Sequence, residues 1–191
     1  MKRSIGHRET LFPCPVWIIG TYDSEGKPNL MTVAWGGIVC SKPASVCISI
    51  REATHSYRSI VERGAFTVNV PNSDQVREAD FAGIASGRDT DKFAATGLTP
   101  VRSGHVDAPM IAEFPLNVEC ELAHTVPIGL HTLFVGEIRD VKADESILDE
   151  KDTPLIRKVN PPIWAPAELA YYSTGEFIGA GLAIGKDLVE K

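Results

Sequence analysis

The chain has 191 residues, of which 43% are apolar and 23% charged, and this balance fits a globular protein rather than a disordered, collagen-like or coiled-coil chain. Lys and Arg number 19 against 25 Asp and Glu, and the net charge of −6 argues against a general nucleic-acid binder, which needs a basic face. The apolar runs are shorter than the roughly 20 residues of a membrane helix, so we expect no membrane partner.

Alternating apolar and polar residues predict strands in the first half of the chain. Residues 16–21 and 30–35 flank the turn-rich segment 23–29, and the two strands are expected to form a hairpin. Residues 46–51 and 66–70 alternate in the same way, with every second side chain apolar.

The second half predicts two further strands and an irregular end. Residues 116–122 alternate, and residues 130–141 form a long apolar-rich strand that we expect to bend at Gly136, because an interior glycine often marks a bulge. From Pro161 onward, closely spaced prolines disfavour helix, and this segment is expected to pack on the barrel or on a second subunit.

Two helices are expected in the connections between strands. Residues 54–63 have Thr54 as a candidate N-cap and Gly64 as a terminator, and residues 73–85 carry an apolar face. Many strands without regular strand–helix alternation predict a mainly β fold, a closed antiparallel barrel with a few flanking helices.

The four cysteines are Cys14, Cys40, Cys47 and Cys120, and they form no CxxC pair and no Cys/His cluster with zinc spacing. We therefore expect buried, reduced thiols, which suit a cytoplasmic location. The start of the chain is basic, but the apolar stretch that follows contains two prolines and no cleavage site, so it does not predict a signal peptide.

Several catalytic motifs are absent from the sequence. Residues 179–185 come close to a dinucleotide-binding glycine fingerprint, but only residues 186–191 follow it, which is too little chain for the helix that the motif requires. The sequence has no nucleophile elbow, P-loop or HExxH motif, and its five histidines are scattered. We expect no metal site and no self-contained hydrolytic site.

Ligand-binding residue types gather instead at predicted strand ends. Asn29 ends the first turn, Trp35 ends the second strand beside two glycines, and Arg51 ends the third strand. Thr54 and Ser56 then open a helix, and a helix N-terminus with hydroxyls and a nearby arginine suits a phosphate. The alternative is structural: Thr54 caps the helix, and residues 86–92 form a solvated loop.

Segments spread along the chain, in consistent order from about residue 10 to residue 175, resemble the flavin reductase-like, FMN-binding split-barrel family, and within it the flavoredoxins. The segments that carry the resemblance are residues 15–21, 28–35, 41–43, 49–56, 65–71 and 91–93, together with the strand that contains His131.

The resemblance implies a Greek-key split β-barrel that forms a homodimer with one FMN per subunit at the dimer interface. Residues 1–191 would then form a single FMN-binding domain with a core of about 10–160. At the isoalloxazine, the resemblance implies Asn29, the backbone of Met31 and Thr32, and Trp35 near the ring. At the ribityl-phosphate it implies Thr54, Ser56 and Lys92, with Arg51 as an addition. His131 would contribute from its strand, and Trp164 from the C-terminal segment. Arg88, in the loop of residues 86–92, is a less specific addition to this set.

The chemistry would then take place on the flavin, and no side chain is expected to act as a separate catalyst. The first hypothesis is an FMN-dependent oxidoreductase that takes electrons from NAD(P)H and reduces free flavin or ferric complexes. The alternative is a non-enzymatic electron carrier that is reduced by a redox protein. A third hypothesis, a binding module without redox use, is disfavoured by the presence of Asn29, Trp35, Thr54 and Lys92.

Overall fold

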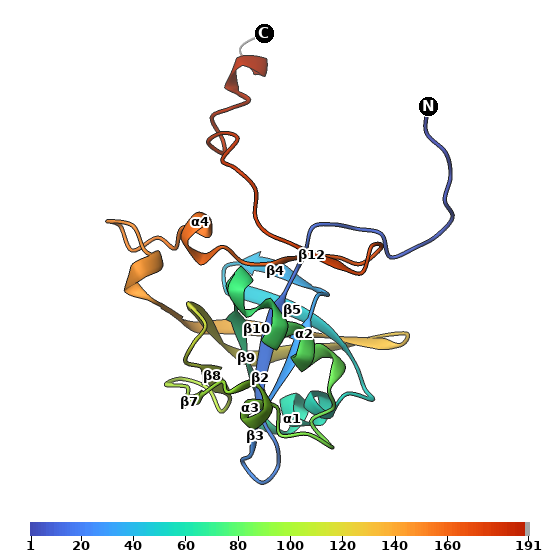
Figure 1. Cartoon of the computed structure of the whole chain (residues 1–191), viewed down its shortest axis with the longest axis vertical. Coiled ribbons are helices and arrows are strands. Elements are labelled where there is room, and N and C mark those ends of the chain that lie inside the picture. Colours follow the sequence, from blue (N-terminus) through green and yellow to red (C-terminus); the bar gives the residue numbers. More distant parts are fainter. Residues whose placement is uncertain (190–191) are drawn as a thin grey trace.

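The computed structural model describes residues 1–189 and contains a seven-stranded antiparallel sheet in the order β3-β2-β6-β9-β10-β5-β4 (Figure 1). Its strands are β2 (Trp17–Tyr22), β3 (Pro28–Val33), β4 (Gly36–Ser41), β5 (Ala44–Arg51), β6 (Ala65–Val70), β9 (Leu116–Ile128) and β10 (His131–Ala143). The expected mainly β fold, an antiparallel barrel with flanking helices, is confirmed.

Two small sheets and four short helices surround this sheet. The first small sheet joins β1 (Cys14–Pro15), β11 (Ile163–Ala165) and β12 (Ala170–Tyr172), and the second pairs β7 (Pro100–Arg102) with β8 (Pro109–Ile111). The helices are α1 (His55–Arg63), α2 (Val76–Ile84), α3 (Lys92–Thr96) and α4 (Ile156–Val159), and single 3₁₀ turns cover Ser73–Gln75, Glu145–Ile147 and Lys186–Leu188.

Strand β2 separates two apolar cores, because its successive side chains point to opposite faces. Ile19 faces the barrel interior with Phe66 and Phe134, whereas Ile18 faces the cluster beneath α2 and α3 with Phe93. Helix α2 packs on β3 at a close approach, where a Cβ on Gly83 would lie 3.3 Å from the Cβ of Thr32. These contacts hold α2 and α3 against β3.

The bend that the sequence predicts at Gly136 is confirmed. The register between β10 and β9 shifts between Val135 and Gly136, which marks a bulge. A Cβ at Gly136 would lie 2.6 Å from Cζ of Phe66 and 2.9 Å from Cβ of Cys120. Glycine is therefore required where β10 crosses the buried phenylalanine ring.

The helix predicted for residues 54–63 is also confirmed: it begins after Thr54 and ends at Gly64, whose φ of 60° is the left-handed conformation that glycine favours. Residues 73–85 form a 3₁₀ turn followed by α2. All four cysteines are free thiols, but the expectation that all are buried holds only for Cys14 and Cys120: Cys47 is half buried and Cys40 is exposed. Cys40 lies on β4, an edge strand of the sheet, where side chains have neighbours on one side only.

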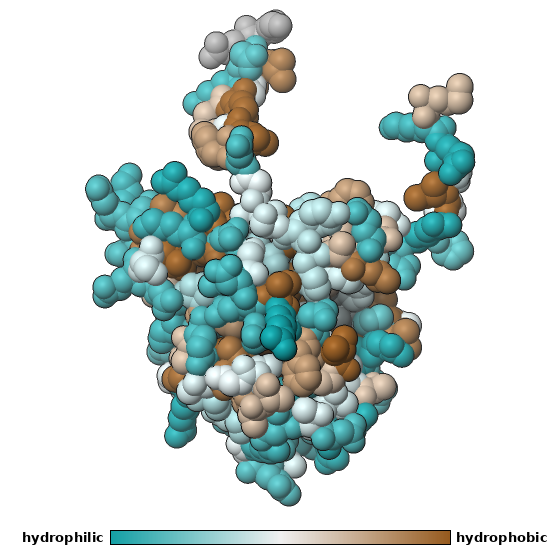
Figure 2. Space-filling model, viewed as in Figure 1, coloured by the Kyte–Doolittle hydropathy of each residue, from teal (hydrophilic) through white to brown (hydrophobic). Residues whose placement is uncertain are grey.

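Both ends of the chain leave the barrel as extended segments, here called the terminal arms, which comprise residues 1–13 and 173–189 (Figure 1). Apolar side chains follow the C-terminal arm (Figure 2), and Phe177 is 84% exposed and Leu182 99% exposed. In the described part of the chain, no helix has both the length and the apolar character to cross a membrane.

Candidate functional site

Two adjoining pockets lie along β3, and together they form one cleft. The inner pocket, of about 200 Å³, lies between β3, the start of α1 and the segment from Ala82 to Gly87. The outer pocket, of about 180 Å³, lies where β3, β5 and β10 meet. Met31 and Thr54 line both pockets, so a single elongated ligand can occupy the two together.

Apart from Trp164 and the loosely assigned Arg88, the site residues predicted from the sequence line this cleft. The inner pocket is lined by Asn29, Met31, Thr54, Ser56 and Lys92, and the outer pocket by Met31, Thr32, Trp35, Arg51, Thr54 and His131. The fold thus brings together segments that are up to a hundred residues apart in the chain.

The N-terminus of α1 opens into the inner pocket. Thr54 occupies the N-cap position, but its hydroxyl donates to the carbonyl oxygen of Arg51 at 2.9 Å instead of accepting from the helix. Within residues 1–189 no side chain caps this end, and the first turn carries no acidic residue. Backbone N–H groups at an uncapped helix start, with the positive end of the helix dipole, attract an anion.

Asn29 is held in place beside this helix start. It is 6% exposed, and its Nδ2 donates to Oγ of the buried Ser56 at 2.9 Å. The loop after α2 closes over it, because a Cβ on Gly87 would lie 2.3 Å from Oδ1 of Asn29 and 2.8 Å from Cδ2 of His55. The loop approaches this closely only because residue 87 has no side chain.

Lys92 places a buried positive charge in the same pocket. The residue is 4% exposed, and its Nζ donates to the carbonyl oxygen of Ala82 at 2.7 Å. Among residues 1–189 it has no carboxylate partner, and burial lowers its pKa to about 8. A desolvated ammonium with one neutral acceptor is unfavourable by itself. An anion in the pocket, such as a phosphate, would supply the missing partner.

The outer pocket is flatter and more open. Residues 31–35 line it, and their end is held where the N–H of Ser49 donates to the carbonyl oxygen of Trp35 at 2.8 Å. His131 on β10 lies directly opposite Arg51 on β5. An open pocket lined by a half-buried indole, an imidazole and a guanidinium suits a planar ring with polar edges.

Trp164 is also not brought to the cleft by the fold. It lies on β11 and packs against Tyr171 with ring centroids 4.8 Å apart. Tyr171 in turn donates from its hydroxyl to Asp80 on α2 at 2.8 Å. Within one subunit, Trp164 therefore belongs to the small sheet that anchors the C-terminal segment.

Some lining residues were missed from the sequence. His55 lines the inner pocket, and its signal was its position between Thr54 and Ser56 at a helix start. Residues 82–86 also line it, and these mostly small or apolar residues carry no sequence signal for a ligand site. In the described residues, no cluster of three or more His, Cys, Asp or Glu is placed to hold a metal ion.

The two pockets together fit a particular kind of ligand. The inner pocket offers a buried cation, free helix N–H groups and hydroxyls, which match a phosphate ester. The outer pocket offers an indole and polar edges, which match an aromatic ring system. The donor set therefore fits a mononucleotide-like cofactor with a planar head group.

Comparison with known proteins agrees with this chemistry. A family model described as "Flavin reductase like domain" matches residues 8–175. The solved structure of a flavoredoxin from Desulfovibrio vulgaris (Miyazaki F) is 50% identical, covers 97% of this chain and 100% of that chain, and superposes with a TM-score of 0.93.

Two more distant proteins extend the comparison. The structure of an FMN-binding protein from Thermus thermophilus shares the fold at 22% identity, covering 94% of this chain and 97% of that one, with a TM-score of 0.78. A ferric-chelate reductase (NAD(P)H) from Archaeoglobus fulgidus is 26% identical over 125 residues, which is 64% of this chain and 73% of that protein.

Proposed function

Because the chain belongs to the flavin reductase-like domain family, we propose that it is an FMN-binding flavoprotein that transfers electrons and acts as an NAD(P)H-linked oxidoreductase on flavin or ferric acceptors. The observation that carries the proposal is the buried Lys92, without a carboxylate partner in residues 1–189, beside the uncapped start of α1. An FMN phosphate supplies the charge that this pocket lacks.

Each half of the cleft would hold one half of the cofactor. Lys92, Thr54 and Ser56, with Arg51 at the edge, would hold the phosphate. Asn29, the backbone of Met31 and Thr32, Trp35 and His131 would hold the ring. When bound, FMN supplies hydride and one-electron chemistry, and the protein supplies binding, orientation and electrostatics.

The chain's own residues have defined tasks in this proposal. Lys92 neutralises charge in a place that water hardly reaches, and the bond from Asn29 to Ser56 fixes the amide that faces the ligand. Arg51 and His131 stand at the more open end, where a reaction partner has access. No acid–base side chain is needed, because the cofactor carries the reaction.

One experiment tests the proposal. The purified protein is saturated with FMN and desalted, its visible spectrum is recorded, and NADPH or NADH is then added without oxygen. We expect a retained flavin spectrum that bleaches within seconds, with turnover when a ferric chelate is supplied. A protein that retains no flavin would contradict the assignment of FMN as a resident cofactor.

The alternative function is an electron carrier fed by a redox protein, and the 50% identity to a flavoredoxin favours it. In that case the retained flavin stays oxidised with either nicotinamide nucleotide and bleaches only when a reduced protein donor is added. The same spectra therefore separate the two functions.

We also propose that residues 1–191 act as one domain in a cytoplasmic homodimer. Ile38 on the edge strand β4 is 81% exposed, and the tip of the β9–β10 hairpin and the terminal arms expose further apolar side chains. A second subunit would cover these surfaces, since exposed apolar patches of this kind mark contact sites. A monomer mass in light scattering at micromolar concentration would contradict this proposal.

A further inference from the structure

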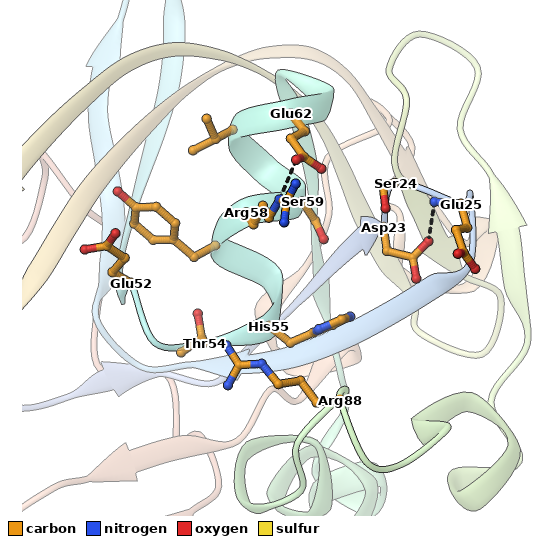
Figure 3. A pocket seen from close by; sticks show the side chains of 12 residues that line it. Asp23, Ser24, Glu25, Glu52, Thr54, His55, Arg58, Ser59, Glu62 and Arg88 are labelled. Atoms are coloured by element: carbon orange, nitrogen blue, oxygen red, sulfur yellow. Dashed lines mark hydrogen bonds and ion pairs between the residues drawn. The ribbon is translucent and has the colours of Figure 1, made fainter.

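Three pockets meet at Thr54, and they differ in charge. Thr54 lines the inner and outer pockets of the cleft and also a pocket along α1, here called the α1 pocket, with a volume of about 680 Å³ (Figure 3). Carboxylates line the α1 pocket, namely those of Asp23, Glu25, Glu52 and Glu62. Among residues 1–189, no carboxylate lines the inner or the outer pocket. A molecule that approaches the cleft therefore meets negative charge on one side of Thr54 and none on the other.

The two arginines of the α1 pocket do not cancel its carboxylates. Arg58 is paired with Glu62 at 2.5 Å (Figure 3), which leaves Arg88 against the other three carboxylates. Two of these three, Glu25 and Glu52, are exposed. Because like charges repel, the α1 pocket disfavours an anionic molecule.

The outer pocket, by contrast, carries a positive charge on Arg51. The residue is exposed, and within residues 1–189 it takes part in no ion pair. Its neighbour Glu52 lines the α1 pocket and not the outer pocket. Arg51 does not line the inner pocket, where Lys92 lies. In a chain with a net charge of −6, this guanidinium is thus available to a ligand at the open end of the cleft.

The backbone of Arg51 is held in place, although its side chain is free. Its carbonyl oxygen accepts from both the N–H and the hydroxyl of Thr54, each at 2.9 Å, so the end of β5 is joined to the start of α1. On the neighbouring strand β10, His131 lies directly opposite Arg51 and lines the same pocket. An imidazole can donate a hydrogen bond in either protonation state. The open end therefore holds a charged donor and a second donor side by side.

We propose that Arg51 selects the electron acceptor by charge, so that the open end of the cleft favours small anionic acceptors, such as ferric ions held by carboxylate chelators, over cationic ones. A guanidinium pairs with a carboxylate through two parallel N–H donors, so Arg51 would contact the chelator and not the iron. The inference rests on the proposed function, because the electrons come from bound FMN. One NAD(P)H and two ferric ions give NAD(P)⁺, two ferrous ions and one proton, so the electrons balance.

Charge at this place acts on the encounter between the protein and the acceptor. The field of an exposed cation reaches about 8–10 Å at physiological ionic strength. A cleft lined by one sign of charge raises the association rate of an oppositely charged partner by about tenfold or more. On the other side of Thr54, the carboxylates of the α1 pocket repel the same anion. An anionic acceptor is therefore guided to the end of the cleft that the proposed function gives to the ring.

The test measures the ratio of two oxidation rates in one preparation. FMN-loaded protein is reduced with a stoichiometric amount of dithionite and mixed by stopped flow with ferricyanide, a trivalent anion, or hexaammineruthenium(III), a trivalent cation. Arg51→Glu reverses the charge and Arg51→Gln removes it. Arg157→Glu, at an exposed arginine on α4, is the control with the same change in net charge as Arg51→Glu. A change in flavin potential acts on both acceptors in the same direction, so the ratio isolates selection by charge.

At low salt, we expect Arg51→Glu to lower the ratio of the ferricyanide rate to the hexaammineruthenium rate by about tenfold or more. Arg51→Gln lowers it less, the control leaves it unchanged, ferric EDTA follows ferricyanide, and high salt reduces all the differences. Equal ratios in Arg51→Glu and Arg157→Glu would overturn the inference, even if reduction by NADPH is slowed, because Arg51 would then serve the donor. A wild type that retains no FMN would instead overturn the proposed function, and the inference with it.

Discussion

The inner and outer pockets of the cleft are built in opposite ways. In the inner pocket, Asn29, Ser56 and Lys92 are all buried, and each makes a hydrogen bond inside the subunit. In the outer pocket, Arg51 is exposed, and Trp35 and His131 are only half buried. One end of the cleft is thus preorganised for a ligand, and the other is left open to a partner.

The difference follows from what each end has to bind. A phosphate is strongly hydrated, so the protein has to replace its water shell. Donors that are already desolvated and point toward the phosphate do this best. A ring that exchanges electrons needs access, so complete enclosure by one subunit would be a disadvantage. The predictions below, which rest on FMN as the ligand, test this division of tasks.

The largest effect is expected for Lys92→Met. Loss of a charged hydrogen bond weakens FMN binding by about 1.5–3 kcal/mol. The apoprotein, freed of a desolvated charge, should melt at the same or a higher temperature. The measurement is a fluorescence titration with parallel thermal melts, and Lys151→Met, at an exposed lysine, is the control. An unchanged FMN affinity would remove Lys92 from the site.

A smaller loss is expected for Gly87→Ala. The new methyl group would collide with Asn29 and His55, and the loop must shift away from the inner pocket. Overpacking of this kind costs about 1–3 kcal/mol, and part of it should be seen in FMN affinity. Gly175→Ala is the control, because a Cβ there meets nothing within 4 Å. Equal FMN affinities in the two variants would show that the loop does not shape the pocket.

FMN affinity and the stability of the apoprotein should change with pH in opposite directions. Burial lowers the pKa of Lys92 to about 8 from 10.5, so between these values the unfolded chain holds the proton and the folded apoprotein does not. The contribution of Lys92 to the stability of the apoprotein therefore rises with pH from about 8 to 10.5. FMN affinity should fall over the same range, because the ammonium is lost.

The pH prediction is checked by urea unfolding and FMN titration from pH 7 to 10.5, each compared with Lys92→Met. The difference between the wild type and the variant isolates this one group. A difference that stays constant with pH would show that Lys92 does not titrate in this range.

The smallest change in affinity is expected at the open end. Trp35→Ala removes an aromatic contact worth about 0.5–1.5 kcal/mol, but it should clearly change the fluorescence and absorption of the bound flavin. Such a spectral change with a modest loss of affinity is the signature of a ring contact. An unchanged spectrum would show that the ring does not contact Trp35, and would contradict the assignment of the ring to the outer pocket.

Much of the barrel was predictable, because apolar and polar residues alternate in β6 and β9 and turn residues separate the early strands. The alternation does not report burial everywhere, since β2 and β6 are buried on both faces. The bulge at Gly136 was also predictable, since few other roles suit a glycine inside an apolar strand. Strand β4 was not predicted, because its two leading glycines and exposed side chains carry no alternation.

Most residues that line the candidate cleft were predictable, but the burial of Lys92 was not. The resemblance named Lys92, yet its polar surroundings in the sequence, Asp89 to Asp91, favour a solvated loop. Its burial comes from α3 packing against β3 and α2, which are contacts between distant segments. For Trp164 the resemblance was misleading: it implies a place near the flavin, but in the structure Trp164 packs against Tyr171 in the small sheet.

The hydrogen bond between Tyr171 and Asp80 connects the base of the C-terminal arm to α2. The same helix carries Ala82, whose carbonyl oxygen accepts from Lys92. The arm and the inner pocket are therefore tied to one rigid element. If the arm contacts a second subunit in the homodimer proposed above, any factor that association adds to FMN affinity is added by FMN to association, and free flavin would then promote assembly.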